Sequence, residues 1–163
     1  MKLNLEQITK ITLCAVDIKE DNGVFSFYRF SEKEAESTNQ AIAKCTAGIE
    51  LHFITDATAL NLSVDVSGKD TPRSFFAVDV FCDGKFIGSI QNIKDEDCVG
   101  DYANKEYTIG KFDGRFNFPP DEKNIRIVLP HSKICQITGI ELTDATFIKP
   151  VKNQSFYLRS EIQ

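Results

Sequence analysis

Alternation of apolar and polar residues along several short segments most constrains the fold of this chain. The clearest case is residues 60–67, LNLSVDVS, where leucine or valine occupies every second position up to Val66. Residues 49–53 and 76–82 show the same pattern. Because successive side chains of a strand point to opposite faces, each segment predicts a strand with one buried and one wet face.

Turn residues separate these segments and place further strands between them. Asp83-Gly84 follows the strand at 76–82 and predicts a tight hairpin into residues 85–90, since glycine tolerates the positive φ that such turns require. Other strand candidates are residues 9–18, 24–30, 107–112, 125–129 and 134–142. Eight or nine short strands predict an all-β fold, an antiparallel β-sandwich.

A single short helix is predicted after residue 31. Ser31 and Glu34 have the spacing of a capping box, and the following residues EKEAESTNQAIAK favour helix until Gly48. Residues 92–105 and 114–123 are predicted as loops. We therefore expect one β-sandwich domain over residues 1–150, with residues 151–163 forming a last strand or the beginning of a connection to another segment.

Composition excludes several classes of partner. The 163 residues include 42% hydrophobic residues, enough for one core, and carry a net charge of -5, which offers no basic face to nucleic acid or an anionic membrane. Five widely spaced cysteines without a Cys-x-x-Cys motif predict reduced, mostly buried thiols. With no continuous apolar stretch near the start, the sequence predicts a cytoplasmic protein.

Sequence motifs give no sign of a catalytic or metal centre. His52 lies on the polar side of an alternating strand and His131 at a strand end, so both are interpreted as surface histidines, and no Gly-x-Ser-x-Gly elbow occurs. Residues 95–106 resemble a calcium loop, but Val99 offers no side-chain oxygen at the fifth position and the flanks are not helical. We expect a solvated acidic loop, no metal and no cofactor.

Sugar binding is the ligand chemistry for which candidate residues can be named. It needs flat aromatic rings beside amide, carboxylate or guanidinium groups. The candidates are Tyr102 and Tyr107 around the acidic loop, Phe81 on the wet face of its strand, and Arg115 and Asn117 as donors.

Four blocks of the chain resemble the N-terminal β-sandwich of two-domain SGNH/GDSL hydrolases. They are FYRFSEKEAE at 27–36, AGIELHFITDA at 47–57, FAVDVFCDGKFIGS at 76–89 and IRIVLPHSKICQITGIELTDATFIKP at 125–150. The resemblance spans most of the chain and rests on the order and spacing of the blocks. It implies a jelly-roll-like sandwich, similar to galactose-binding domains and carbohydrate-binding modules, that precedes a catalytic domain acting on acyl or acetyl esters.

The catalytic motifs of that family are absent from the chain. Its only Gly-Asp pair, Gly100-Asp101, is followed by Tyr102 instead of serine, and neither histidine has an aspartate three residues before it. We expect a non-catalytic accessory domain that positions or covers the substrate cleft of an SGNH catalytic domain in cis. A stand-alone carbohydrate-binding module is the alternative, and an enzyme of unrecognised type is a third possibility.

Overall fold

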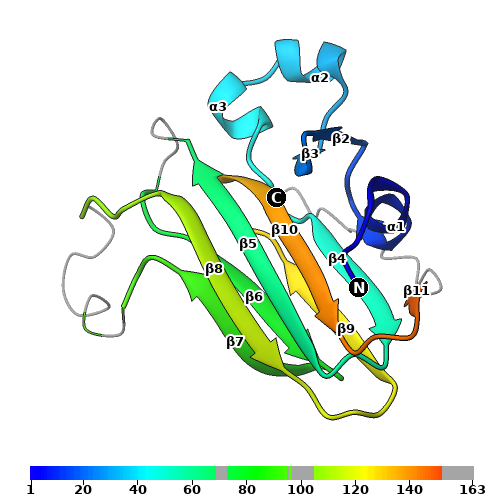
Figure 1. Ribbon diagram of the computed structural model, residues 1–163. Coiled ribbons are helices and arrows are strands. Elements are labelled where there is room, and N and C mark those ends of the chain that lie inside the picture. The colour runs from blue at the N-terminus through cyan, green and yellow to red at the C-terminus, as the bar shows by residue number, and fades with distance from the viewer. Residues whose placement is uncertain (69–72, 95, 97–104, 152–163) are drawn as a thin grey trace, which may run out of the picture.

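The computed structural model describes residues 1–68, 73–94, 96 and 105–151, whose strands form two antiparallel sheets packed face to face (Figure 1). The front sheet has the order β2(Asp17–Asp21), β3(Val24–Tyr28), β10(Ile134–Thr143), β5(Ala59–Ser67), β8(Gly110–Asn117). The back sheet has the order β1(Thr12–Leu13), β4(Glu50–Thr55), β9(Lys123–Val128), β6(Ala77–Cys82), β7(Lys85–Gln91), and β11(Ile148–Pro150) pairs with β4. The predicted antiparallel β-sandwich is confirmed.

Alternation along the strands produces the core between the sheets. On β5 the residues from Leu60 to Val66 alternate between buried and half-buried, and β4 and β6 show the same alternation. The largest fully buried apolar side chains come from both sheets and from α1: Phe53, Ile8, Ile11, Ile49, Leu51, Leu60, Leu62, Ile125, Ile127, Ile137 and Ile140. Burial of this apolar surface is the main contribution to the stability of the fold.

The predicted hairpin between β6 and β7 is confirmed. Asp83 and Gly84 have φ angles of 48° and 77°, the two positive values of a type I′ turn, whose twist matches that of paired strands. The Asp83 carboxylate also accepts a hydrogen bond from the backbone N–H of Asn124, at 2.9 Å. This contact attaches the turn to the neighbouring strand β9.

β8 extends further than the sequence predicts. The prediction of a loop over residues 114–123 is wrong for 114–117, which continue β8, and for Lys123, which begins β9; β8 itself begins at Gly110 instead of residue 107. At Gly114 the sheets approach so closely that a Cβ atom would lie 2.6 Å from Cγ1 of Ile90 on β7. Glycine here provides space between the sheets, although in a sequence it resembles a turn residue.

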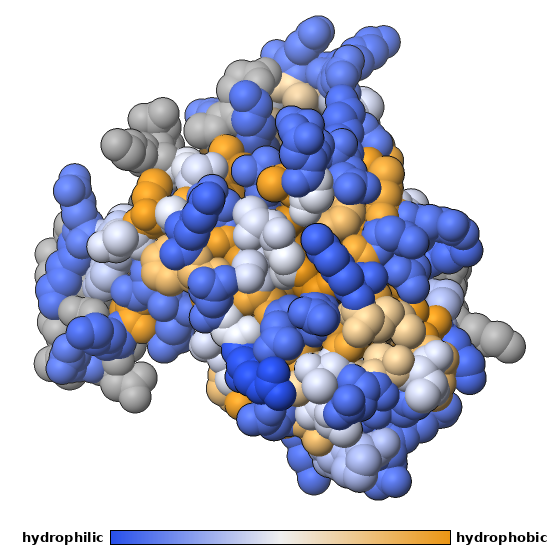
Figure 2. All heavy atoms as spheres, in the orientation of Figure 1, coloured by the Kyte–Doolittle hydropathy of each residue, from blue (hydrophilic) through white to orange (hydrophobic). Residues whose placement is uncertain are grey.

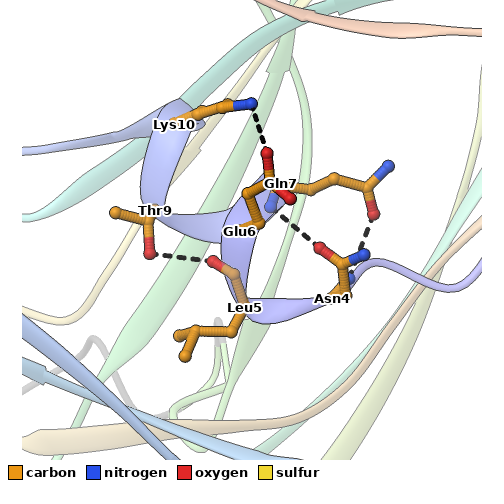
Figure 3. A network of polar contacts seen from close by, with 6 residues as sticks. All are labelled: Asn4, Leu5, Glu6, Gln7, Thr9 and Lys10. Carbon is orange, nitrogen blue, oxygen red and sulfur yellow. Dashed lines mark hydrogen bonds and ion pairs between the residues drawn. The ribbon is translucent and has the colours of Figure 1, made fainter.

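The N-terminal segment forms a helix, α1(Leu5–Ile11), so the predicted strand over residues 9–18 is wrong at its start. Figure 3 shows the capping box: Asn4 Oδ1 accepts from the Gln7 backbone N–H at 3.0 Å, and Gln7 Oε1 accepts from the Asn4 N–H at 3.1 Å. Lys10 and Glu6, one helical turn apart, form an ion pair with 2.6 Å between Nζ and Oε1, which also stabilises the helix. Local capping thus overrides the β-propensity of isoleucine and threonine.

The predicted helix after Ser31 is present but interrupted. The capping box of Ser31 and Glu34 starts α2(Glu32–Glu36), as predicted, and a second short helix follows, α3(Gln40–Ala43). The hydroxyls of Ser37 and Thr38 donate to the Glu34 carbonyl, at 2.8 and 3.1 Å. Such side-chain to backbone bonds compete with helix continuation, which explains the break.

The described cysteines agree with the prediction of reduced, mostly buried thiols. All four are thiols: Cys14 is exposed, whereas Cys45, Cys82 and Cys135 are buried, and Cys98 lies outside the described residues. Burial raises the pKa of the three buried thiols, which keeps them protonated and unreactive. In the described part of the chain, no helix is long and apolar enough to cross a membrane.

Candidate functional site

The predicted sugar-binding residues do not form one platform. Arg115 and Asn117 are exposed on the outer face of the front sheet, whereas Phe81 lies on the outer face of the back sheet. Tyr107 is half-buried in the segment before β8, and Tyr102 lies outside the described residues. Because the two outer faces point away from each other, Phe81 and the β8 residues cannot contact the same small ligand.

The outer face of the front sheet is polar and its side chains bond to one another. Arg115 Nη1 donates to Asn61 Oδ1 at 2.9 Å, and the Ser63 hydroxyl donates to the Asp113 carboxylate at 2.5 Å. Figure 2 shows hydrophilic and neutral side chains over the front sheet, with hydrophobic ones visible between them. Arg115 therefore bonds to a neighbour on the same sheet, as in an ordinary solvated face.

The outer face of the back sheet carries a row of aromatic and charged side chains. Phe86 and Phe81 lie edge to face with ring centroids 5.7 Å apart, and the Arg126 guanidinium lies 5.4 Å from the Phe81 centroid. Arg126 also donates twice to Glu50, each time at 2.6 Å, and this bonding raises its pKa. We call these four residues the arginine–phenylalanine row. The Phe86 end of the row faces solvent, since this side chain is 59% exposed.

A cleft of about 510 Å³ opens beside this row, where β6 begins and β9 ends. Its lining comes from those strands, from the residues just before β6 and from the loops after β7 and β9: Arg73, Phe75, Phe76, Ala77, Asp79, Ile93, Val128, Leu129, His131 and Ser132. We call it the Asp79 cleft. His131 is exposed, and its Nδ1 lies 3.3 Å from the hydroxyl of Ser132.

Asp79 is the unusual residue of the cleft. It sits on the outer face of β6, paired across the strands with Val128 and Ser89. Its side chain is partly buried, and burial raises its pKa. Within the described part of the chain its carboxylate has no hydrogen-bond or ion-pair partner. Partial burial without a donor disfavours the charged form of this carboxylate.

Phe75 forms an aromatic wall of the cleft and connects it to a predicted residue. The Tyr107 ring meets Phe75 edge to face at 6.3 Å, and the Arg73 guanidinium lies 5.7 Å from the Phe75 centroid. Tyr107 thus belongs to the surroundings of the Asp79 cleft. Sequence reasoning missed Phe75, although the Phe75-Phe76 doublet carries a signal: adjacent residues of an extended segment face opposite ways, so one ring must leave the core.

Asn92 holds the walls of the cleft together. Its side-chain oxygen accepts from the backbone N–H of Phe76 at 2.8 Å, and its amide donates to the carbonyls of Ser74 at 3.1 Å and Thr108 at 2.9 Å. Three chain segments are joined by one side chain. This arrangement supports the backbone around Phe75 without any help from a ligand.

The described residues do not assemble a hydrolytic centre. His52 Nε2 lies 2.6 Å from Asn124 Oδ1, and His131 contacts Ser132, so within those residues neither imidazole is bonded to a carboxylate that could orient it as a base. No group of three or more potential metal ligands occurs among the residues that the structure describes. Most of the predicted acidic loop at 95–106 lies outside them.

Comparison with known proteins gives structural likenesses only. No protein-family model matches the sequence, and no curated protein matches it. The structure is similar to the salicylyl-acyltransferase SsfX3 from a tetracycline biosynthetic pathway, with a TM-score of 0.63 and 16% identity over 87% of this chain and 39% of that protein. It is also similar to a protein of Bacteroides ovatus ATCC 8483 described as a GDSL-like lipase, with a TM-score of 0.54 and 12% identity over 94% of this chain and 43% of that protein.

The chain spans about two fifths of the length of each of these solved structures. At such low identity the likeness concerns the fold alone. The β-sandwich is therefore a fold that also occurs in a solved acyltransferase and in a solved protein described as a GDSL-like lipase.

Proposed function

We propose that this chain is a non-catalytic β-sandwich domain that works beside an SGNH-type catalytic domain acting on acyl or acetyl esters. One observation carries the proposal: nearly the whole chain matches about two fifths of an acyltransferase and of a GDSL-like lipase. The lack of an oriented base among the described residues is consistent with a supporting role.

The arginine–phenylalanine row is the surface that we assign to contact with the catalytic domain. Phe86 and its neighbour Ile87 are 59% and 41% exposed, at the end of a row that continues inward to Phe81. Exposed aromatic and aliphatic residues beside a fixed arginine are typical of the centre of a protein interface. The bond to Glu50 holds Arg126 in place, so little side-chain entropy would be lost on contact.

The contribution of such a domain is positional. A rigid sandwich that covers one side of an acyl-substrate cleft orients the substrate and excludes water from it. In this proposal the nucleophile, the base and the oxyanion donors belong to the catalytic domain, and the chain supplies a wall.

The test compares the complete product of the gene that encodes this chain with residues 1–163 alone, using p-nitrophenyl acetate and butyrate. We expect turnover only by the complete product, and roughly a tenfold loss of kcat/KM when Phe86→Ser and Ile87→Ser are combined in it. Lys111→Ser on the front sheet is the matched control. Turnover by residues 1–163 alone, or a complete product without an SGNH catalytic segment, would contradict the proposal.

A second candidate function, a stand-alone carbohydrate-binding module, is favoured by the Asp79 cleft with its aromatic wall. It predicts that the chain is retarded in electrophoresis through gels containing a soluble polysaccharide. The Tyr107→Ala variant should lose the retardation because Tyr107 supports Phe75. No retardation on a broad panel of polysaccharides would remove this candidate.

A further inference from the structure

We propose that the Asp79 cleft binds a neutral polyhydroxylated ligand, such as a sugar, whose hydroxyl groups donate to the Asp79 carboxylate. The proposal names the site for the carbohydrate-binding candidate and rests on that candidate. It does not depend on contact with a catalytic domain, because the arginine–phenylalanine row lies outside the cleft lining.

The first step concerns the missing donor. Two other outer-face carboxylates have partners: Asp113 accepts from Ser63, and Glu50 accepts two bonds from Arg126. Asp79 is partly buried and has none within the described residues. A ligand that donates hydrogen bonds to this carboxylate would compensate for its desolvation, and bonds to a charged acceptor are stronger than neutral ones.

The second step concerns the charge of the ligand. Among the residues that the structure describes, Asp79 is the one carboxylate in the lining of the cleft, and the other polar lining groups are Arg73, His131 and Ser132. A metal ion would find this single carboxylate with a guanidinium nearby, which is an unfavourable donor set. A neutral molecule that both donates and accepts hydrogen bonds can use the carboxylate together with the side chains of His131 and Ser132.

The third step concerns shape. Phe75, Ile93 and Val128 give the cleft apolar walls, against which the C–H face of a sugar ring can pack while its hydroxyls reach the polar groups. The volume of about 510 Å³ is within the range of small-molecule sites, roughly 300–1,000 Å³. The three bonds of Asn92 fix the backbone around Phe75, so the wall is formed before a ligand arrives.

The experiment is an NMR titration of the ¹⁵N-labelled 163-residue chain. The probes are cello-, xylo-, manno- and galacto-oligosaccharides and myo-inositol, with spermidine as a cationic probe. We expect saturable amide shifts around Phe75, Asp79, Val128 and His131 with at least one neutral probe and none with spermidine.

Variants identify the acceptor and the wall. Asp79→Asn should weaken binding about tenfold or more, because it removes the charged acceptor while keeping the size of the side chain. Phe75→Ala should have a similar effect, and Asp65→Asn, an equal charge change on the opposite outer face, should change affinity by less than about twofold.

Three outcomes would overturn the assignment: no saturable shift with any neutral probe, binding of spermidine in preference to the sugars, or full affinity in a folded Asp79→Asn variant. Each outcome is separate from the esterase test. Loss of sugar binding leaves the turnover of the complete gene product unchanged, and a failed turnover test leaves the titration of the isolated chain intact.

Discussion

The two outer faces of this sandwich are built on strands of the same pattern, yet they differ in how their side chains are satisfied. On the front sheet, Arg115 and Asp113 bond to neighbouring polar residues. On the back sheet, Phe86 is exposed and Asp79 is partly buried without a partner among the described residues. Polar side chains of the front face thus bond to one another, whereas the back face leaves an aromatic ring in solvent and a carboxylate without a donor among those residues. Substitutions on and between the two faces can break or sharpen this contrast.

The largest effect is expected where the two sheets come closest. In Gly114→Ala the new Cβ would lie 2.6 Å from Cγ1 and 2.9 Å from Cδ1 of Ile90, so the sheets must separate locally. We predict a loss of about 1–3 kcal/mol in the free energy of unfolding, measured by urea denaturation. Gly139→Ala is the control, because its nearest contact is 3.4 Å away. Gly114→Ala should cost less in an Ile90→Ala background, which removes both of these atoms, and an equal cost there would show that the clash is misplaced.

The next effect compares the arginines of the two faces. Arg126→Ala removes a bidentate bond and leaves Glu50, whose side chain is 21% exposed, without it; we predict a loss of about 1–2 kcal/mol. Arg115→Ala removes one exposed bond to Asn61 and should cost less than about 0.5 kcal/mol. Chemical unfolding of both variants and of Arg126→Lys provides the measurement. Equal losses at the two positions would abolish the contrast between the faces.

A smaller effect of opposite sign is expected at Asp79. Burial penalises its ionised form, so Asp79→Asn should stabilise the free chain at pH 7, by less than about 1 kcal/mol, whereas Asp113→Asn should slightly destabilise it. The folded pKa of Asp79 lies above its ordinary value of 3.8, so between the two values the folded state binds more protons than the unfolded state. The advantage of Asp79→Asn should therefore shrink as the pH falls through the folded pKa.

Urea unfolding of the wild type and of Asp79→Asn between pH 7 and pH 4 measures this difference. A stability difference that grew on acidification would show that folding does not raise the pKa of Asp79.

The smallest effect on stability is expected at the exposed end of the arginine–phenylalanine row. Phe86→Ser and Ile87→Ser, at the edge of the back sheet, should each change the free energy of unfolding by about 0.5 kcal/mol or less, because both side chains are exposed. They should nevertheless reduce the binding of a hydrophobic dye to the folded chain. Dye fluorescence unchanged in the double variant would show that the back face is not the apolar surface of the chain.

Much of the fold could be predicted from the sequence because the strands of the core have a clear alternating pattern. The alternation from Leu60 to Val66 and the Asp83-Gly84 turn correspond directly to β5 and to the β6 hairpin. The errors occurred where a local interaction competes with the pattern. The capping box of Asn4 and Gln7 makes an isoleucine-rich segment helical as α1. Gly114 is needed because the two sheets approach closely at that position, and a pattern of neighbouring residues cannot predict a contact between distant strands.

The candidate site was harder to predict than the fold. Asp79 occupies a polar position of an alternating strand, where an aspartate looks like any solvated residue, and its burial comes from segments distant in sequence. Phe81, Arg115 and Asn117 were grouped by residue type, but neighbouring strands of a sandwich can belong to opposite sheets. Of the predicted residues that the structure describes, Tyr107 is the one placed against the wall of the cleft.

The three hydrogen bonds of Asn92 have a consequence for how this surface could change over evolution. They act as a removable cross-link between the entry to β6, the exit from β7 and the approach to β8. A single substitution there would release all three segments at once, so the shape of the cleft could be altered in one mutational step while the sheets beneath it keep their register. Conversely, as long as Asn92 is retained, substitutions at Phe75 or Tyr107 would change which side chains line the cleft while the backbone stays the same.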